Sequence, residues 1–238
     1  MNRPQVVNAS EWRAARTALL DQEKAAVRQR DAVATARRAL PMVRVENDYK
    51  FAGPNGPVRL RDLFGSHPQL IVYHFMFDPS WEQGCKSCSF LADGLQSSLP
   101  HLNAAHTGVA LVSRAPLARL EPFRRRMGWT MPWYSSADSR FNFDFQVSLE
   151  GQPDEEYNFR TVAEHHKNGA AWIGKGELPG ISVFLRDDDN IYRTYSAYSR
   201  GMDILLNTFN YLDLTPLGRQ EEGLPPMGWV RHHDRYEA

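Results

Sequence analysis

The sequence of 238 residues contains only two cysteines, and both lie within one four-residue stretch. Two cysteines cannot build the disulfide framework of a small secreted scaffold. The longest apolar run covers only residues 70–77, too few to cross a bilayer, and the first residues lack the apolar core of a secretory signal. These absences predict a cytoplasmic protein without a membrane partner.

The chain also has no excess of positive or negative charge. Lys and Arg together number 28, as do Asp and Glu, so the formal net charge is +0 and no nucleic-acid partner is expected. No glycine-rich phosphate loop is present, and no organic cofactor is expected. The 42% hydrophobic and 24% charged content is typical of a globular protein, and the length suits one elaborated domain.

Residues 1–41 are predicted to form a helical extension. Ser10 is the expected N-cap and Pro41 the expected stop, with no glycine or proline between them. Two alternatives follow for the apolar face of this helix: it packs on its own domain, or it pairs with a second copy of the chain in a homodimer. That face consists of residues that recur at every seventh position: Trp12, Leu19, Ala26, Val33 and Leu40.

The rest of the chain, residues 42–238, is predicted to be an α/β domain with a mixed central sheet. The continuous apolar run at 70–77 is typical of a central strand covered on both faces. Residues 137–176 are expected to form an irregular insertion. The other expected elements are a hairpin turning at 53–56, a helix at 89–106, a strand at 109–115, a helix at 116–128, a hairpin at 181–199 and a closing helix at 202–216.

Both cysteines follow the central strand, in the sequence Cys85-Lys86-Ser87-Cys88. Ligands usually meet such sheets at the carboxyl end of a central strand. Cys85 is expected at the N-terminus of the next helix, where free backbone N–H groups and the helix dipole favour a thiolate. Such surroundings lower a cysteine pKa from about 8.5 to about 7 or below. The pattern therefore favours a redox pair in which Cys85 attacks and Cys88, in the first helical turn, resolves.

Two other interpretations of the cysteines stay open. A structural zinc site needs four ligands, and no histidine has a recognisable spacing to the pair, so no metal is expected. The two thiols could also be small side chains packed under a helix. As a bridge, a four-residue ring adds only about 2 kcal/mol of stability in the loop-entropy model, which suits exchange better than structural support.

Three neighbours of the pair have alternative roles. Trp81 could wall the site or anchor its loop. Glu82 could transfer protons to or from the resolving thiol, as an acid beside a reactive cysteine often does, or it could be a solvated loop carboxylate. His74, inside the apolar run, is expected to be a hydrogen-bonded core histidine.

The order strand, CxxC, helix, strand, helix, and then proline, strand, strand, helix resembles the thioredoxin-like fold. In that fold a cis proline before the third core strand lies against the CxxC. The resemblance therefore makes Leu178–Pro179 a candidate cis bond and Pro179 part of the substrate groove. More specifically, the chain resembles the bacterial thioredoxin-like family DUF899 from Glu11 to Tyr236. The phrases that carry this resemblance are "LPMVRVENDYKF", "QLIVYHFMFDPSWEQGCKSCSF", "PGISVFLRDDDNIYRTYSAYSRG" and "WVRHHDRY".

The sequence also departs from related patterns. Thioredoxins have Cys-Gly-Pro-Cys, and the proline and threonine of peroxiredoxins are replaced by Asp78 and Glu82 before Cys85. A dedicated peroxidase of that type is not expected, although thiol-based peroxide reduction by another geometry stays open. The sequence thus predicts a thiol–disulfide oxidoreductase that acts on a protein or small-molecule disulfide. The alternative is a thioredoxin-fold binding or scaffold protein without chemistry.

Overall fold

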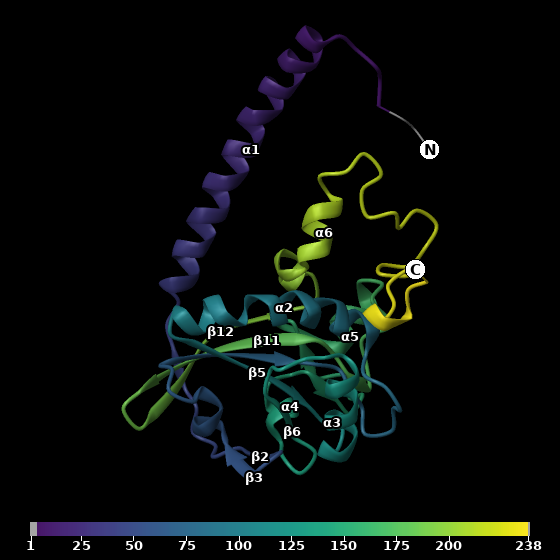
Figure 1. Cartoon of the computed structure of the whole chain (residues 1–238). Coiled ribbons are helices and arrows are strands. Elements are labelled where there is room, and N and C mark those ends of the chain that lie inside the picture. The colour runs from purple at the N-terminus through teal and green to yellow at the C-terminus, as the bar shows by residue number, and fades with distance from the viewer. Residues whose placement is uncertain (1–3, 238) are drawn as a thin grey trace.

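An eight-stranded mixed sheet forms the centre of the computed structural model, which describes residues 4–237 (Figure 1). Its strands are β1 (Val43–Arg44), β2 (Lys50–Gly53), β3 (Gly56–Arg59), β4 (Gln69–His74), β5 (Thr107–Ser113), β6 (Trp133–Ser135), β11 (Gly180–Asp187) and β12 (Asn190–Tyr198). They lie in the order β1-β12-β11-β4-β5-β6-β2-β3. The three strands β4, β5 and β6 are parallel, whereas β11 is antiparallel to β4 and β12 is antiparallel to β11.

The helices complete the order expected of a thioredoxin-like fold. They include α1 (Ala9–Arg38), α2 (Lys86–Ala104), α3 (Leu117–Arg126) and α6 (Asn207–Leu212). α2 connects β4 to β5, and α6 follows the β11–β12 hairpin. The unit β4-α2-β5 and the unit β11-β12-α6 share one sheet in the order β5-β4-β11-β12, which confirms the predicted fold class. The closing helix predicted as one piece is divided into a 3-10 helix at Ser199–Leu205 and α6.

β4 is covered on both faces, as the apolar run predicted. Leu70 and Val72 belong to one core cluster, and Tyr73 belongs to the other, because successive side chains of a strand point to opposite faces. The regular strand ends at His74. Beyond it, the Phe75 N–H still donates to the carbonyl of Val112 at 3.0 Å, so the chain stays beside β5 as it approaches the cysteines.

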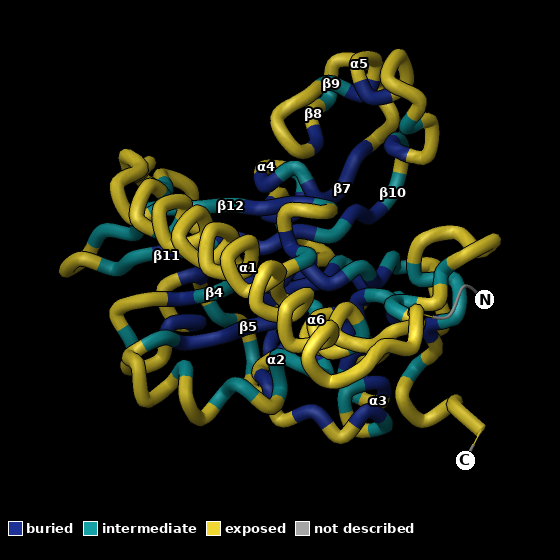
Figure 2. The backbone as a smooth tube through the Cα atoms, turned by 90° about the horizontal axis from the view of Figure 1, so that it is seen from above, coloured by how far each residue is buried: buried dark blue, intermediate teal, exposed yellow. Residues whose placement is uncertain are grey.

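Helix α1 does not bury its apolar face on its own domain, although its last turn contacts β12 where the Arg37 guanidinium lies 5.4 Å from the centre of the Tyr195 ring. It contains no buried residue, and Figures 1 and 2 show it projecting from the sheet with an exposed surface. Trp12, for example, is 61% exposed. The first alternative for its apolar face is therefore wrong. The N-cap is Asn8 and not Ser10, because Asn8 and Glu11 exchange side-chain-to-backbone hydrogen bonds of 3.0 and 3.1 Å in a capping box.

Residues 137–176 are more ordered than the predicted irregular insertion. The short elements here are α4 (Phe141–Asp144), β7 (Ser148–Leu149), β8 (Glu156–Tyr157), β9 (Arg160–Thr161), α5 (Val162–Lys167) and β10 (Gly176–Glu177). Val147, Tyr157 and Ile173 pack with Leu178 and Tyr198 in a third apolar cluster. This small core holds the segment against the start of β11 and the end of β12. Across residues 4–237, no helix has both the length and the apolar content needed to cross a bilayer.

His74 is the hydrogen-bonded core histidine that the sequence predicted. Its Nε2 lies 2.9 Å from the Oγ of Ser182, which in turn lies 3.2 Å from the Oγ of Ser196. The ring of Phe145 stacks on the imidazole, and no described residue hydrogen-bonds Nδ1. Because burial disfavours the charged imidazolium, the pKa of His74 is lowered from about 6.5 to about 3.

This buried imidazole predicts a loss of stability in acid. Between pH 6.5 and about 3 the unfolded chain binds a proton at His74 that the folded chain does not. The free energy of unfolding is therefore complete above pH 6.5 and falls by about 1.4 kcal/mol per pH unit below it. Urea unfolding at several pH values between 5 and 7 gives the free energy of unfolding as a function of pH. This free energy should fall less steeply in acid for His74→Gln than for the wild type, by the equivalent of about one proton. His101→Gln, at an exposed position, is the control. Equal slopes for wild type and His74→Gln would contradict this account.

Candidate active site

The two cysteines lie where the chain turns from β4 into α2. The Cys85 N–H donates to the carbonyl of Met76 at 3.1 Å, which brings the end of the loop back to the end of the strand. Cys85 is the N-cap residue of α2, and Cys88 is the third residue of the helix. The predicted position of the pair at a helix N-terminus is confirmed.

Gly84 allows the loop before Cys85 to come close to the end of β4. A Cβ atom on Gly84 would lie 2.6 Å from Cε1 of Phe75, closer than side-chain atoms approach one another, and 3.2 Å from Cε1 of Phe123, a tight contact. The backbone before Cys85 therefore passes directly against two core aromatic rings. Because those rings are buried, the position of Cys85 is set by the core and not by a free loop.

The environments of the two thiols differ. Both cysteines are unbridged; Cys85 is half-buried, whereas Cys88 is buried at 1% exposure. The Cys88 thiol, assisted by backbone N–H groups of Cys88 and Ser87, hydrogen-bonds the Cys85 sulfur and lowers the pKa of Cys85 to about 7, against the opposing effect of burial. Burial and the neighbouring Cys85 raise the pKa of Cys88 well above its usual value. Near neutral pH, Cys85 is thus the more acidic of the two thiols and Cys88 holds its proton.

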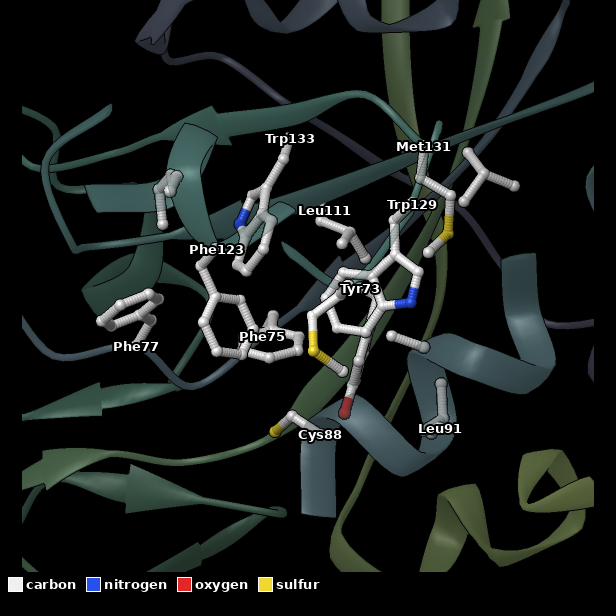
Figure 3. Packing of buried hydrophobic residues seen from close by; sticks show 14 of the residues in the cluster. Tyr73, Phe75, Phe77, Cys88, Leu91, Leu111, Phe123, Trp129, Met131 and Trp133 are labelled. Carbon is white, nitrogen blue, oxygen red and sulfur yellow. The ribbon is translucent and has the colours of Figure 1, made fainter. Parts of the chain in front are cut away.

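Tyr73 is a site residue that the sequence analysis missed. It lies in β4 at 1% exposure and in the same buried cluster as Cys88, and burial together with the neighbouring Cys88 raises the pKa of its phenol well above the usual value. Figure 3 shows the Tyr73 oxygen pointing toward the turn of α2 that carries Cys88. The available signal was strand alternation: Tyr73 shares a face of β4 with the residues that α2 covers.

A second missed feature is the C-terminal strap, residues 228–236, which lies beside the cysteines. His232 donates from Nε2 to the carbonyl of Gly84 at 2.9 Å, and Lys86 donates from Nζ to the carbonyl of Gly228 at 3.3 Å. The strap therefore contacts the residues on both sides of Cys85. No local sequence pattern indicates this contact, because Gly84 and His232 are 148 positions apart.

Arg126, at the end of α3, fixes the strap. Its guanidinium forms two hydrogen bonds of 2.8 Å with the carboxylate of Asp234 and a third of 2.8 Å with Oε1 of Gln83. Its Nη2 also lies 3.2 Å from Nδ1 of His232, which accepts when the imidazole carries its proton on Nε2. The Arg126 guanidinium lowers the pKa of Asp234 to about 2, so the ion pair persists across the neutral range.

The other predicted neighbours lie at the surface. Trp81 is 38% exposed, and its carbonyl accepts a hydrogen bond from Arg119 of α3, which anchors the loop. Glu82 is exposed, and its carboxylate hydrogen-bonds no described residue. Its position fits the solvated-carboxylate alternative. Within residues 4–237, no three His, Cys, Asp or Glu side chains gather in a way that could hold a metal ion.

The expectation of a cis bond at Leu178–Pro179 is wrong. No peptide bond of the described chain is cis. The ordered 137–176 segment engages both sides of this bond: the Leu178 N–H donates to the carbonyl of Val147 at 2.8 Å, and the Pro179 carbonyl accepts from the hydroxyl of Tyr157 at 2.8 Å. Those contacts hold a trans, extended entry into β11.

Comparison with known proteins gives one family match. The model of a family described as "Bacterial protein of unknown function (DUF899)" matches residues 1–236. No curated protein gives a significant match.

Several solved structures are similar at low identity. Peroxidoxin BcpB from Mycobacterium tuberculosis is 15% identical with a TM-score of 0.45, covering 73% of this chain and 97% of its own. A PrxQ mutant from Xylella fastidiosa is 14% identical with a TM-score of 0.43, covering 68% and 88%. A peroxiredoxin Q mutant from Xanthomonas campestris is 16% identical with a TM-score of 0.42, covering 68% and 90%. At these scores the similarities support no statement about the reaction.

The hydrogen bond between the thiols predicts the effect of Cys88→Ala. Without the Cys88 donor, the pKa of Cys85 should rise from about 7 by about one to two units, because a hydrogen bond to a charged group contributes about 1.5–3 kcal/mol. The pH dependence of alkylation by iodoacetamide reports this midpoint, with Cys85→Ser as the background control. An unchanged midpoint in Cys88→Ala would show that the helix N-terminus alone sets the pKa.

The strap yields a separate prediction. Asp234→Asn removes the charge that Arg126 holds, so the strap should detach more often. We expect trypsin cleavage after Arg231 and alkylation of Cys85 to accelerate by about two- to fivefold, as for loss of a partly exposed ion pair. Asp189→Asn, which breaks an exposed pair with Arg61 at the far hairpin, is the matched control. If both variants behave like the wild type, the strap does not limit access to Cys85.

Proposed function

The chain belongs to the DUF899 family, and from the geometry of its cysteine pair we propose that it is a thiol–disulfide oxidoreductase. The observation that carries the proposal is the half-buried Cys85 at the N-cap of α2, with its pKa lowered to about 7 by the thiol of Cys88. A thiol of this pKa is about half ionised at neutral pH, close to the optimum for attack on a disulfide. A protonated partner three residues away supplies the second thiol.

The reaction has two exchange steps. The Cys85 thiolate attacks one sulfur of a substrate disulfide, whose S–S bond breaks, and the other sulfur leaves as a thiolate. Cys88 then gives its proton to the departing thiolate and attacks the sulfur of Cys85. This breaks the mixed disulfide, forms the Cys85–Cys88 bond and releases the second substrate sulfur as a thiolate, which takes a proton from solvent. The substrate gains two electrons that the cysteine pair loses, and an external thiol reverses both steps.

The position of the bridge suits repeated formation and cleavage. α2 already holds Cys85 and Cys88 within one turn, so a bond between them restricts the unfolded chain little. The loop-entropy model gives about 2 kcal/mol for such a ring and about 3 for a 15-residue loop. We place this chemistry in the cytoplasm, where glutathione can return the pair to the thiol form.

We assign Pro179 and Trp81 to the borders of the substrate groove. Gly180 lies opposite His74 in the sheet, so Pro179 comes beside the chain that continues to Met76, whose carbonyl binds the Cys85 N–H. Trp81 stands on the exposed side of the same loop. A protein or small-molecule disulfide would meet Cys85 between them.

The reduction potential tests the proposal. Equilibration in glutathione buffers with quantification of free thiols should give a value between about −120 and −270 mV, the range of known exchange catalysts. Cys85→Ser should abolish disulfide turnover, whereas Cys88→Ser should accumulate a mixed disulfide on Cys85 that mass spectrometry detects. Ser97→Ala, at an exposed position further along α2, is the control. If no Cys85–Cys88 bond forms in any buffer, the pair has a packing role and the scaffold alternative stands.

A further inference from the structure

The resolving step requires a charge at a buried sulfur. Cys88 is 1% exposed and belongs to the larger apolar core cluster. When it attacks Cys85, or leaves during the reverse step, its sulfur carries a negative charge in apolar surroundings. An unpaired buried charge is costly, so the rate of this step depends on a hydrogen-bond donor beside the sulfur.

Tyr73 is the side chain placed to donate to that sulfur. β4 fixes its backbone between Leu111 of β5 and Ile181 of β11, in the middle of the sheet. The ring is 1% exposed and packs edge-on against Phe75 at 6.0 Å. Figure 3 shows its oxygen directed at the turn of α2 that holds Cys88, with apolar side chains on the other sides.

We propose that Tyr73 is a catalytic residue of the resolving step, in which its hydroxyl donates a hydrogen bond to the Cys88 sulfur as that sulfur becomes a thiolate. This inference rests on the proposed exchange reaction. The sequence suggested Glu82 as the group that assists the resolving thiol. Glu82 lies at the surface, whereas Tyr73 lies beneath the buried thiol.

The proton balance is consistent with this role. The proton of Cys88 leaves with the departing substrate thiolate, and Tyr73 keeps its own proton throughout. Burial, together with the neighbouring Cys88, raises the pKa of Tyr73 well above its usual value, so the phenol remains a donor at every pH at which the protein works. In the reverse direction Cys88 is the leaving group, and the same hydrogen bond stabilises it.

Tyr73→Phe isolates the hydroxyl, because phenylalanine preserves the ring and its packing. With excess 5,5′-dithiobis(2-nitrobenzoate), attack by Cys85 releases a first thionitrobenzoate and resolution by Cys88 releases a second. In stopped-flow measurements the first release should be unchanged and the second slowed by about ten- to a hundredfold. That factor corresponds to one hydrogen bond to a charged group. Tyr192→Phe, on β12, should leave both releases unchanged.

The other possible results distinguish a failure of the role of Tyr73 from a failure of the exchange reaction. An unchanged second release in Tyr73→Phe would overturn the role of Tyr73, and a wild type that gives no fast first release would overturn the exchange reaction itself. A variant that unfolds would expose both thiols and accelerate both releases. Dithiothreitol attacks the mixed disulfide on Cys85 without Cys88, so after removal of excess reagent it should reduce the mixed disulfides of Cys88→Ser and of Tyr73→Phe/Cys88→Ser at equal rates. A slower reaction of the variant with dithiothreitol would mean that the substitution disturbs Cys85 as well, against the proposal.

Discussion

The burial of β4 on both faces is the constraint on which the rest of the structure depends. A strand without a solvent face must direct every side chain into a core, and alternation decides which core. Leu70 and Val72 enter one cluster, whereas Tyr73 enters the cluster beneath α2. Because β4 is fixed by β5 and β11, the chain that leaves it has little freedom, and Cys85 is tied to it through the carbonyl of Met76.

Several segments distant in sequence then complete the surroundings of Cys85. Gly84 lets the backbone touch Phe75 and Phe123, and Arg126 holds the strap through Asp234. The strap in turn contacts the residues on each side of the nucleophile. These contacts are polar and partly exposed, whereas the contacts beneath Cys88 are apolar and buried. The site thus has a buried apolar inner wall and a polar, partly exposed outer wall.

The features that the sequence could predict are those encoded by nearby residues. The apolar run identifies β4, and the spacing of Cys85 and Cys88 places both at the start of a helix. Features that depend on distant partners were missed or mistaken. The bond before Pro179 is trans, its two residues are hydrogen-bonded to the distant Val147 and Tyr157, and the strap reaches Gly84 across 148 positions. No local pattern specifies such contacts, since each depends on how the sheet brings separate segments together.

The difference in burial between the two thiols argues against a packing role for the pair. Two cysteines that only fill space would both be buried in apolar surroundings, with high pKa values. Cys88 fits that description, but Cys85 does not: it is half-buried at a helix N-terminus, and the thiol of Cys88 lowers its pKa. One proton between two sulfurs therefore has a defined location, on Cys88. In the exchange reaction that we propose, that location sets the order of events: the accessible sulfur carries the charge and attacks first, and the buried sulfur responds after a mixed disulfide has formed on Cys85.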